Sequence, residues 1–525
     1  MNGRGTGTGA PHSAGGSGLL MGDRTAPTPL IFERSIPGRR ASTLPSLDVD
    51  GRPVEDLLQG AELASSPPPL PEVNERDIVQ HYTRLSQRNH GIDLGHYPLG
   101  SCTMKYNPKV AERVAALPGF AGLHPATPAA YAQGTLAVLH EVEQWVCELT
   151  GMAAATLQPS AGAQGELVGL MVMRAFHEHR GDARRTVIIP DSAHGTNPAS
   201  VTLGGYRTVT VPSDRRGLVD VDALARLVDE DAAGLMLTNP NTLGLFETDI
   251  ERIAGLLHDV GALLYYDGAN FNAILGRVRP GDMGFDIVHL NVHKTFATPH
   301  GGGGPGGGPV GVSQRLAPYL PGPMVVRAHD GSFTWRTPER SLGRVHGWYG
   351  NVGIMVRALA YLIANGGEGL RRVAELAVLN ANYLAERVRD TYPLAFDGRP
   401  MHEFVCVPPG DLRGGIKNMD LAKRLIDLGF HPPTVSFPLI VPNCFMVEPT
   451  ETEAPETLDA FADAMLQAVA DAREDPDWVR RAPVTTPVAR LDEARAARDL
   501  RPRWRPPATP DVSDRRAGER RAAPG

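Results

Sequence analysis

The chain has 525 residues, of which 42% are hydrophobic and 21% charged, so we expect a globular protein of two or three domains. Its formal net charge of -7 gives no overall basic surface, which argues against nucleic acid as the default partner. The four cysteines form no C-x-x-C pair, which indicates neither a disulfide framework nor a zinc site and is typical of a reducing cytoplasm. No apolar stretch approaches the roughly 18 residues of a membrane span, and no secretory signal is visible.

Composition and hydrophobic pattern divide the chain into four parts. Residues 1–71 are rich in Gly, Ser, Thr and Pro, and we expect a disordered leader followed by an extended arm. We expect a large domain over 72–330, opening with a helix near 79–87, and a small C-terminal domain over 331–485. The Arg/Ala/Pro-rich tail over 486–525 is expected to pack poorly.

The middle of the chain alternates between helical and strand periodicity. Expected helices cover 131–150, 166–179, 221–227 and 250–260. Expected strands cover 186–190, 207–211, 234–238, 262–266, 287–290 and 310–312. Short apolar strands that alternate with helices predict an α/β fold with a mainly parallel sheet covered on both faces. Ligands in such sheets bind at the carboxyl ends of the strands.

The C-terminal part is expected to form a smaller α+β domain. Residues from about 340 to 390 have strong helical periodicity. The pattern then predicts strands over 403–407, 434–437 and 444–447, and helices over 421–428 and 456–470. Mixed short strands and helices of this kind favour a separate core.

Lys294 and Asp267 each follow a predicted strand. A lone lysine after a strand is usually a surface residue, and an aspartate there is usually a cap or a turn residue. Together they suit pyridoxal phosphate, because the lysine can bind the cofactor covalently. The carboxylate of Asp267 can keep the pyridine nitrogen protonated.

Two further segments add to this pair. Ser160–Glu166 opens a helix with small residues, so that its backbone can approach a phosphate and the free N–H groups of the helix N-terminus can bind one. His194 follows the 186–190 strand and is placed in order to stack on an aromatic ring.

The glycine-rich run over 301–308 fits a backbone-lined loop near an anion or a subunit boundary. Each element is weak alone, since caps, turns and linkers use the same residues. The order of phosphate loop, aromatic residue, strand-end aspartate and lysine is similar to that of the aminotransferase-like pyridoxal phosphate fold, fold type I. That resemblance implies a large domain with a mainly parallel sheet and a smaller C-terminal α+β domain.

Longer motifs resemble one family. The distinctive segment is Asp-Leu-Gly-His-Tyr-Pro-Leu-Gly-Ser-Cys-Thr-Met-Lys-Tyr-Asn-Pro at 93–108. With it stand Ala161–Glu166, Ser192–Pro198, Asp267–Asn270 and His293-Lys294-Thr295. Together, over about residues 29–485, they resemble the P-protein of the glycine cleavage system, the glycine dehydrogenases (decarboxylating).

The resemblance implies an assembly. Some members of the family are single chains of about twice this length, and others are split into two subunits, the second of which carries the lysine. A chain of this length with Lys294 looks like subunit 2. This implies a partner subunit 1 in an α2β2 assembly and a second partner, the lipoylated H-protein.

The family's site residues can be carried over by motif. Lys294 would bind pyridoxal phosphate, His194 would stack on its ring, and His293 or the freed lysine would move protons. The cofactor-binding residues implied are Lys294, Asp267, His194, Ala269, Ala163, Gln164 and Asn241. Residues 96–105 would line the substrate entrance, and no metal is implied.

The implied reaction is an oxidation by a disulfide. Glycine loses its carboxylate as CO2, and the aminomethyl group passes to the lipoyl arm of the H-protein. No nicotinamide is needed, and the sequence has no strand followed by G-x-G-x-x-G.

Two alternatives stay open from the residues alone. One is a related enzyme of the same fold, such as a serine hydroxymethyltransferase or a cysteine desulfurase, with Cys102 as the candidate nucleophile. The other is a non-catalytic scaffold subunit, which we would expect to lack Lys294 or Asp267.

Overall fold

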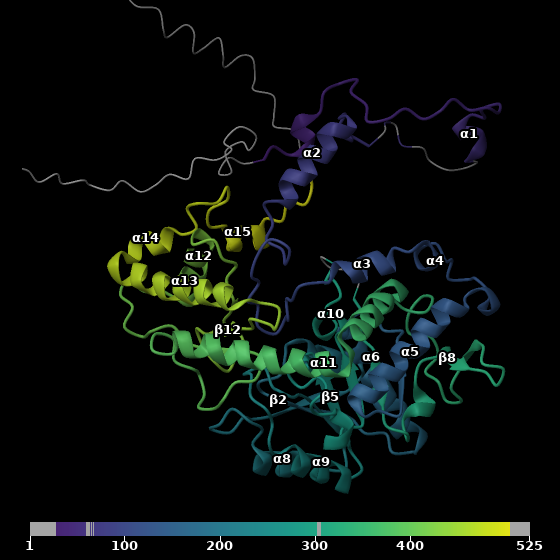
Figure 1. Ribbon diagram of the computed structural model, residues 1–525, viewed down its shortest axis with the longest axis vertical. Coiled ribbons are helices and arrows are strands. Elements are labelled where there is room, and N and C mark those ends of the chain that lie inside the picture. The colour runs from purple at the N-terminus through teal and green to yellow at the C-terminus, as the bar shows by residue number, and fades with distance from the viewer. Residues whose placement is uncertain (1–27, 59–63, 65, 67, 302–305, 505–525) are drawn as a thin grey trace, which may run out of the picture. The chain divides into compact units, whose positions relative to one another are not determined.

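The computed structural model describes residues 28–58, 64, 66, 68–301 and 306–504, which fall into two units. Thr28–Ala482 forms one compact unit (Figure 1). The described part of the other unit holds a single short helix, α15 (Glu493–Arg498), within the predicted tail. The predicted leader lies almost wholly outside the described residues. No helix in the described ranges is long and apolar enough to cross a membrane.

A seven-stranded sheet forms the centre of the large domain. Its strands are β1 (Ala154–Thr156), β2 (Thr186–Pro190), β3 (Arg207–Val211), β4 (Ala232–Thr238), β5 (Leu263–Gly268), β6 (Ile287–Leu290) and β7 (Val310–Val312). They lie in the order β1-β7-β6-β5-β4-β2-β3. The pairs from β3 to β6 are parallel, and β7 is antiparallel to both of its neighbours. The predicted mainly parallel sheet is therefore confirmed.

Helices cover both faces of this sheet, as the alternating pattern predicted. One face packs on α5 (Gln133–Thr150), α8 (Val221–Leu227), α9 (Ile250–Asp259) and the first half of α11 (Val352–Val388). The other face packs on α6 (Gly162–His179) and α7 (Thr196–Leu203). Strand residues alternate between the two cores because successive side chains of a strand point to opposite faces.

The C-terminal domain has its own core around a three-stranded antiparallel sheet. Its strands are β10 (Phe404–Cys406), β12 (Phe445–Val447) and β11 (Thr434–Val435), in that order. Its helices are α12 (Asn418–Asp427), α13 (Pro455–Glu474) and α14 (Pro476–Arg481). The second half of α11 packs into this core, so one long helix belongs to both cores and the expected boundary at 330/331 stays a prediction.

The shorter elements join these two layers. The arm carries η1 (Ile31–Arg34), α1 (Val54–Leu57) and α2 (Glu75–Ser86), followed by α3 (Lys109–Ala115), α4 (Pro118–Ala121) and η2 (Ala129–Tyr131). Further along lie η3 (Phe271–Ala273), η4 (Pro280–Met283), α10 (Val292–Thr295), η5 (Ala317–Tyr319), β8 (Met324–Arg327) and β9 (Phe333–Arg336). The hairpin of β8 and β9 was not predicted, and the helix expected from about 340 begins only at Val352. The stretch before Val352 contains residues with positive φ, Gly343, Trp348 and Gly350, which an α-helix does not accommodate.

Candidate active site

Asp267 and His289 lie side by side at the carboxyl end of the central strands. Asp267 belongs to β5 and pairs in register with His289 of β6. The Nε2 atom of His289 is 3.2 Å from Oδ1 of Asp267, and its Nδ1 faces the Tyr265 hydroxyl at 3.1 Å. Both side chains are buried, with 2% exposure or less. The sheet register thus places a histidine directly against the predicted cofactor aspartate.

Two hydrogen-bond donors and one imidazole surround the Asp267 carboxylate. Besides His289, the Asn197 Nδ2 donates to Oδ2 at 2.9 Å and the Ala269 backbone N–H donates to Oδ1 at 2.9 Å. Burial alone would raise the pKa of Asp267, but the His289 charge, these two hydrogen bonds and the Lys294 charge lower it below its usual value. Asp267 is therefore held as a buried anion.

Glu166 of α6 organises the residues behind Asp267. Its Oε1 accepts from the Thr196 hydroxyl at 2.8 Å, and its Oε2 accepts from the Ser200 hydroxyl at 2.8 Å and from Asn197 at 3.3 Å. Asn197 therefore bridges the two carboxylates. Glu166 and Asn197 lie within the sequence motifs, but the motifs alone predicted a role for neither.

His194 lies in the turn between β2 and α7. Its Nδ1 accepts from the Thr196 backbone N–H at 3.2 Å and lies 2.8 Å from the Thr196 hydroxyl. The ring meets Phe437 of the C-terminal domain edge-on, with centroids 5.4 Å apart. Burial and the nearby Lys294 charge lower the pKa of His194. The ring is therefore held in one orientation at the junction of the two domains.

The first turn of α6 is open at the predicted phosphate loop. Ala163 is exposed and Gln164 half-buried. Gln164 Oε1 accepts from the backbone N–H and the hydroxyl of Ser160, at 2.7 and 2.8 Å, and its Nε2 donates to the Val345 carbonyl at 2.8 Å. The first N–H groups of an α-helix have no partner within the helix, so this turn can receive an anion.

The described end of the glycine run lies against this loop. The Gly308 N–H donates to the Pro159 carbonyl at 2.9 Å, and a Cβ at Gly308 would lie 2.2 Å from the Ala161 carbonyl oxygen. Only glycine permits this approach of two backbones. The prediction of a backbone-lined loop is thus supported over Gly306–Gly308, whereas residues 302–305 lie outside the described part.

Lys294 lies in α10, the one-turn helix that follows β6. Its Nζ donates to the Ser101 carbonyl at 2.8 Å, a contact that crosses 193 residues of sequence. Ser101 belongs to the 93–108 segment that the sequence marked as distinctive. The Lys294 charge acts on Asp267 and on His194, so the structure brings these three predicted residues together.

His293 and His300 pack against each other beside Lys294. Their rings meet edge-on with centroids 5.0 Å apart. Burial, the neighbouring His300 and the Lys294 charge lower the pKa of His293 to about 3, and burial and Lys294 lower that of His300 to about 4. Both rings are therefore neutral near pH 7.

Two glutamates from the C-terminal domain face the same lysine. Glu403 precedes β10 and Glu448 follows β12, and the Phe404–Val447 register places them opposite each other. Both are fully buried with His402, whose Nε2 is 3.8 Å from Glu448 Oε1. These three residues were missed, because a signal for them exists only once the strands of the second domain are paired.

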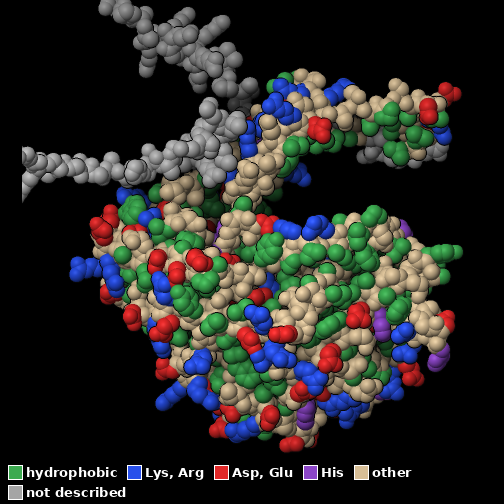
Figure 2. Space-filling model, in the orientation of Figure 1, with side chains coloured by type: hydrophobic (Ala, Val, Ile, Leu, Met, Phe, Trp, Pro, Cys, Tyr) green, Lys and Arg blue, Asp and Glu red, His purple; other side chains and the backbone are tan. Residues whose placement is uncertain are grey.

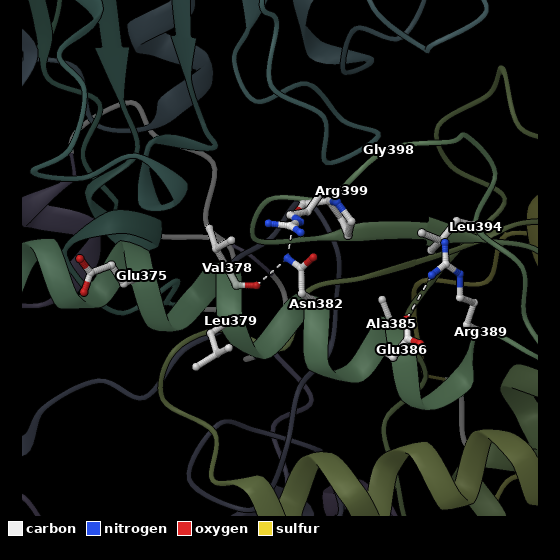
Figure 3. A pocket seen from close by; sticks show the side chains of 11 residues that line it. Glu375, Val378, Leu379, Asn382, Ala385, Glu386, Arg389, Leu394, Gly398 and Arg399 are labelled. Carbon is white, nitrogen blue, oxygen red and sulfur yellow. Dashed lines mark hydrogen bonds and ion pairs between the residues drawn. The ribbon is translucent and has the colours of Figure 1, made fainter.

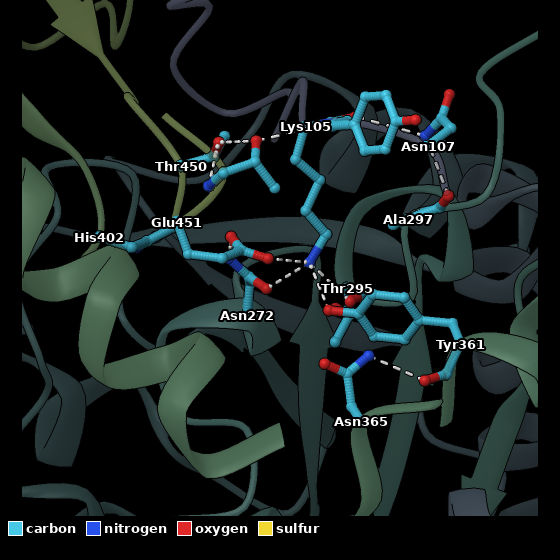
Figure 4. Close-up of polar contacts among 12 residues, drawn as sticks. Lys105, Asn107, Asn272, Thr295, Ala297, Tyr361, Asn365, His402, Thr450 and Glu451 are labelled. Carbon is cyan, nitrogen blue, oxygen red and sulfur yellow. Dashed lines mark hydrogen bonds and ion pairs between the residues drawn. The ribbon is translucent and has the colours of Figure 1, made fainter. Parts of the chain in front are cut away.

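Lys105 anchors the distinctive segment 93–108 through its buried side chain. Figure 4 shows its Nζ at the centre of four acceptors: Glu451 Oε1 and the Thr295 carbonyl at 2.8 Å, Asn272 Oδ1 at 2.9 Å and the Tyr361 hydroxyl at 3.4 Å. Its exposure is 2%. Lys105 thus ties the peptide beside Lys294 to both domains, and its side chain lies in a closed cluster rather than at an entrance.

Asn241 and Ala269 complete the predicted set. Asn241 Oδ1 accepts from the N–H groups of Leu243 and Leu245, and its Nδ2 donates to the Gly217 carbonyl at 2.8 Å. Its amide is engaged in shaping its own turn, and its contact with a cofactor stays a prediction. Ala269 is buried directly after β5, next to Asp267.

Two cavities lie outside this cluster. One of 590 Å³, shown in Figure 3, is lined by α11 residues such as Asn382, by Arg389 directly after that helix and by residues of the segment 394–400. The other, of 470 Å³, is lined by apolar and aromatic residues including the stacked pair Trp335 and Tyr349. Lys294 lines neither of them, and the second borders the phosphate loop through Asn351, which donates to the Ser160 carbonyl at 3.2 Å.

Comparison with protein families decides the assignment. A model described as glycine cleavage system P-protein matches residues 54–335, more than half of the chain. The chain belongs to the glycine cleavage system P-protein family. A second model, described as glycine dehydrogenase, C-terminal domain, matches residues 373–481. The resemblance drawn from the sequence motifs is thereby confirmed.

Curated relatives extend this family match over most of the chain. A protein of Caldanaerobacter subterraneus subsp. tengcongensis is 54% identical over 476 residues, 90% of this chain and 98% of the relative. One of Halalkalibacterium halodurans is 56% identical over 470 residues, 89% and 96%. Both are named probable glycine dehydrogenase (decarboxylating) subunit 2.

Solved structures share the fold. A glycine decarboxylase (P-protein) of the glycine cleavage system, crystallised in inhibitor-bound form, superposes with a TM-score of 0.67 at 23% identity, covering 79% of this chain and 95% of that one. A glutamate decarboxylase of Lactobacillus brevis does so with a TM-score of 0.60 at 16% identity, covering 80% and 96%. This chain therefore has the predicted fold type I architecture, with a large sheet domain and a smaller C-terminal domain.

Proposed function

We propose that this chain is the cofactor-carrying subunit 2 of a glycine dehydrogenase (decarboxylating). It would release CO2 from glycine and transfer the aminomethyl group to the lipoyl arm of the H-protein. The observation that carries the proposal is a buried, ionised Asp267 that shares a site with Lys294 and His194. Family membership favours this reaction over that of a transferase or a desulfurase, and it favours an enzyme over a scaffold subunit.

The residues fit pyridoxal phosphate. A pyridinium nitrogen needs a buried anion, and Asp267 is the anion whose pKa the protein lowers despite complete burial. A phosphate needs free N–H groups, which the first turn of α6 offers at Ala163 and Gln164. A covalent attachment needs an amine, and Lys294, whose charge acts on Asp267 and on His194, supplies it.

Bound there, pyridoxal phosphate would supply an electron sink for the electron pair left when the carboxylate of glycine departs. Asp267 would keep negative charge at the ring nitrogen, and Asn197 with His289 holds its carboxylate in place. His194 would lie on the ring with its tilt set by Thr196. Ala269 would pack on the opposite face.

Proton movement falls to groups around Lys294. The low pKa of His293 leaves a free imidazole at neutral pH, which can accept a proton but holds it weakly. The amino group of Lys294, which glycine would displace from the cofactor, is the other group that can accept one. We therefore assign proton transfer at the reacting nitrogen to Lys294 and a polar, neutral contact to His293.

An exposed apolar surface supports a protein partner. Hydrophobic side chains gather over α3 and α11 (Figure 2). Among the residues on these helices, Val110, Ile363, Leu376 and Leu379 are 40% to 68% exposed. Exposed apolar side chains that gather on one face of a protein are typical of subunit contacts. We assign it to subunit 1, whose presence the names of the curated relatives imply.

The reaction can be tested by isotope exchange. The chain is mixed with subunit 1, lipoylated H-protein, pyridoxal phosphate and glycine, and the entry of labelled bicarbonate into the glycine carboxyl is measured. We expect exchange that requires the H-protein and disappears in Lys294→Ala. The matched control is Lys423→Ala, which removes a half-buried lysine of α12 in the C-terminal domain.

Two results would separate the parts of the proposal. A cofactor absorbance band that borohydride fixes to Lys294, without exchange under any combination of partners, would retain the cofactor and reject the glycine reaction. Absence of that band would reject the cofactor as well.

A further inference from the structure

The turn that meets Lys294 has an unusual backbone. Ser101 and Thr103 have φ values of 64° and 49°, in the left-handed region that non-glycine residues seldom adopt. Gly100, which precedes them, contacts the C-terminal domain closely, because a Cβ added at Gly100 would lie 2.1 Å from the Met446 side chain. Such a backbone persists only where surrounding contacts hold it.

Two buried carboxylates hold this turn. Glu403 Oε2 accepts from the Ser101 N–H at 2.7 Å, and Glu448 Oε2 accepts from the Thr103 N–H at 2.9 Å. Asn270 donates to the other oxygen of Glu403 at 3.0 Å. Both glutamates are fully buried at the ends of paired strands, so their positions are set by the sheet of the C-terminal domain.

The far side of the turn presents a carbonyl to the catalytic lysine. Between the two clamped N–H groups, the Ser101 carbonyl accepts from Lys294 Nζ at 2.8 Å. The clamp thus fixes the direction of one peptide carbonyl, and that carbonyl receives the amino group expected to carry the cofactor.

The Lys294 charge also reaches the two glutamates. Burial raises the pKa of Glu403 and of Glu448, and the Lys294 charge partly opposes that rise. Glu448 Oε1 and both ring nitrogens of His402 are buried without a hydrogen-bond partner among the described residues. The two glutamates therefore act on the turn through their hydrogen bonds to its backbone N–H groups.

We propose that the Ser101 carbonyl is the rest position of the free Lys294 ammonium, and that Glu403 and Glu448 are positioning residues that hold this carbonyl in place. The inference rests on the proposed function, because a lysine that carries the cofactor must leave it when glycine binds. Glycine would take the place of Lys294 on the cofactor, and two protons of its ammonium would pass to the lysine nitrogen. Lys294 would then leave as an ammonium, and no oxidant or further reactant is needed.

The clamp can be tested without any cofactor. Hydrogen exchange is followed by mass spectrometry on peptides that cover residues 99–104 in the full chain, for Glu403→Gln, Glu448→Gln and the corresponding alanine variants. We expect exchange at least about tenfold faster in the alanine variants, the factor equivalent to a lost charged hydrogen bond, and a smaller rise with glutamine.

Glu247 provides the matched control. It is also buried and accepts two backbone N–H groups, from Val219 at 2.8 Å and Asp249 at 3.1 Å. Glu247→Gln and Glu247→Ala should leave exchange over 99–104 unchanged. Equal protection in the Glu403 and Glu448 variants would overturn the clamp. If the alanine variants do not fold, the glutamine pair decides.

The rest position is tested by the return of Lys294 to the cofactor. The loaded chain is saturated with glycine and then diluted rapidly, and the recovery of the absorbance band of the lysine-bound cofactor is timed. We expect recovery to slow at least about tenfold in Glu403→Gln and Glu448→Gln while glycine affinity changes little, because a displaced lysine costs rate rather than substrate binding.

Recovery slowed no more than in Glu247→Gln would overturn the rest position while the cofactor assignment stands. Absence of a cofactor band in the unmodified chain would instead reject the proposed function, and with it the rest position. The exchange measurement would still decide whether the two glutamates hold the turn.

Discussion

Asp267 and Glu448 are both buried carboxylates within the electrostatic reach of Lys294, yet their pKa values move in opposite directions. Burial raises both, but the His289 charge and hydrogen bonds from Asn197 and a backbone N–H bring the pKa of Asp267 below its usual value. Glu448 has a single backbone donor at Thr103 and lies opposite Glu403, and burial raises its pKa to about 7. The charge of His289, together with a second hydrogen-bond donor, and not the depth of burial, makes Asp267 the permanent anion of the two.

The largest effect on stability is expected at a third buried carboxylate, Glu451. Glu451 is paired with Lys105, so the variant Lys105→Met should leave an uncompensated charge and lower the free energy of unfolding by about 3–5 kcal/mol. The double variant Lys105→Met, Glu451→Leu should recover most of that loss, as measured by urea unfolding. A single variant as stable as the parent would show that the pair contributes nothing.

The donor side of the comparison is tested at Asp267. Replacing the anion by an amide in Asp267→Asn should lower the rate of glycine–bicarbonate exchange by about 10²–10³-fold while the cofactor still binds. Asp286→Asn is the control, since Asp286 is also buried on this sheet but lies before β6, where it accepts from the Leu264 N–H at 3.0 Å. Equal losses in the two variants would indicate damage to the sheet instead of lost charge at the ring.

The donor-poor side should appear as a pH dependence of stability. The pKa of Glu448 rises from 4.5 to about 7, so the folded state binds this proton more tightly than the unfolded state does. Its contribution is complete below pH 4.5 and is lost as pH rises to about 7, amounting to at most about 3 kcal/mol. Glu448→Gln should flatten the melting temperature over this window, whereas Glu456→Gln on exposed α13 should not. An unchanged slope in Glu448→Gln would contradict the raised pKa.

The smallest effect is expected at the phosphate loop. Gln164→Ala removes the contacts with Ser160 and Val345 that stiffen the first turn of α6, and it should weaken pyridoxal phosphate binding by roughly tenfold. The rate at saturating cofactor should change little, as absorbance titration and exchange together would show. The control is Gln133→Ala in α5, which loses similar side-chain contacts with the backbone of Phe333. A fall in rate without loss of affinity would remove the loop from phosphate binding.

Local pattern was sufficient for the large domain. The strands 186–190, 207–211, 287–290 and 310–312 and the helix 221–227 have the bounds that periodicity predicts. Their backbones are set by short-range hydrophobic spacing, which can be read directly from the chain. The motifs that follow these strands also identified the family, because turn residues at strand ends carry the chemistry.

Contacts between distant segments were beyond local pattern. The sequence by itself determined that Asp267, His194 and Lys294 follow strands of one parallel sheet, and thus that they meet at one edge. It could not place His289 against Asp267, which depends on strand register. Nor could it place Glu403 and Glu448 beside the turn, because 302 residues separate Glu403 from Ser101 and 345 separate Glu448 from Thr103. It could not predict the pairing of Lys105 with Glu451 either. Those pairings were decided by the packing of the two domains, because burial selects partners by geometry in space and leaves no periodic trace along the chain.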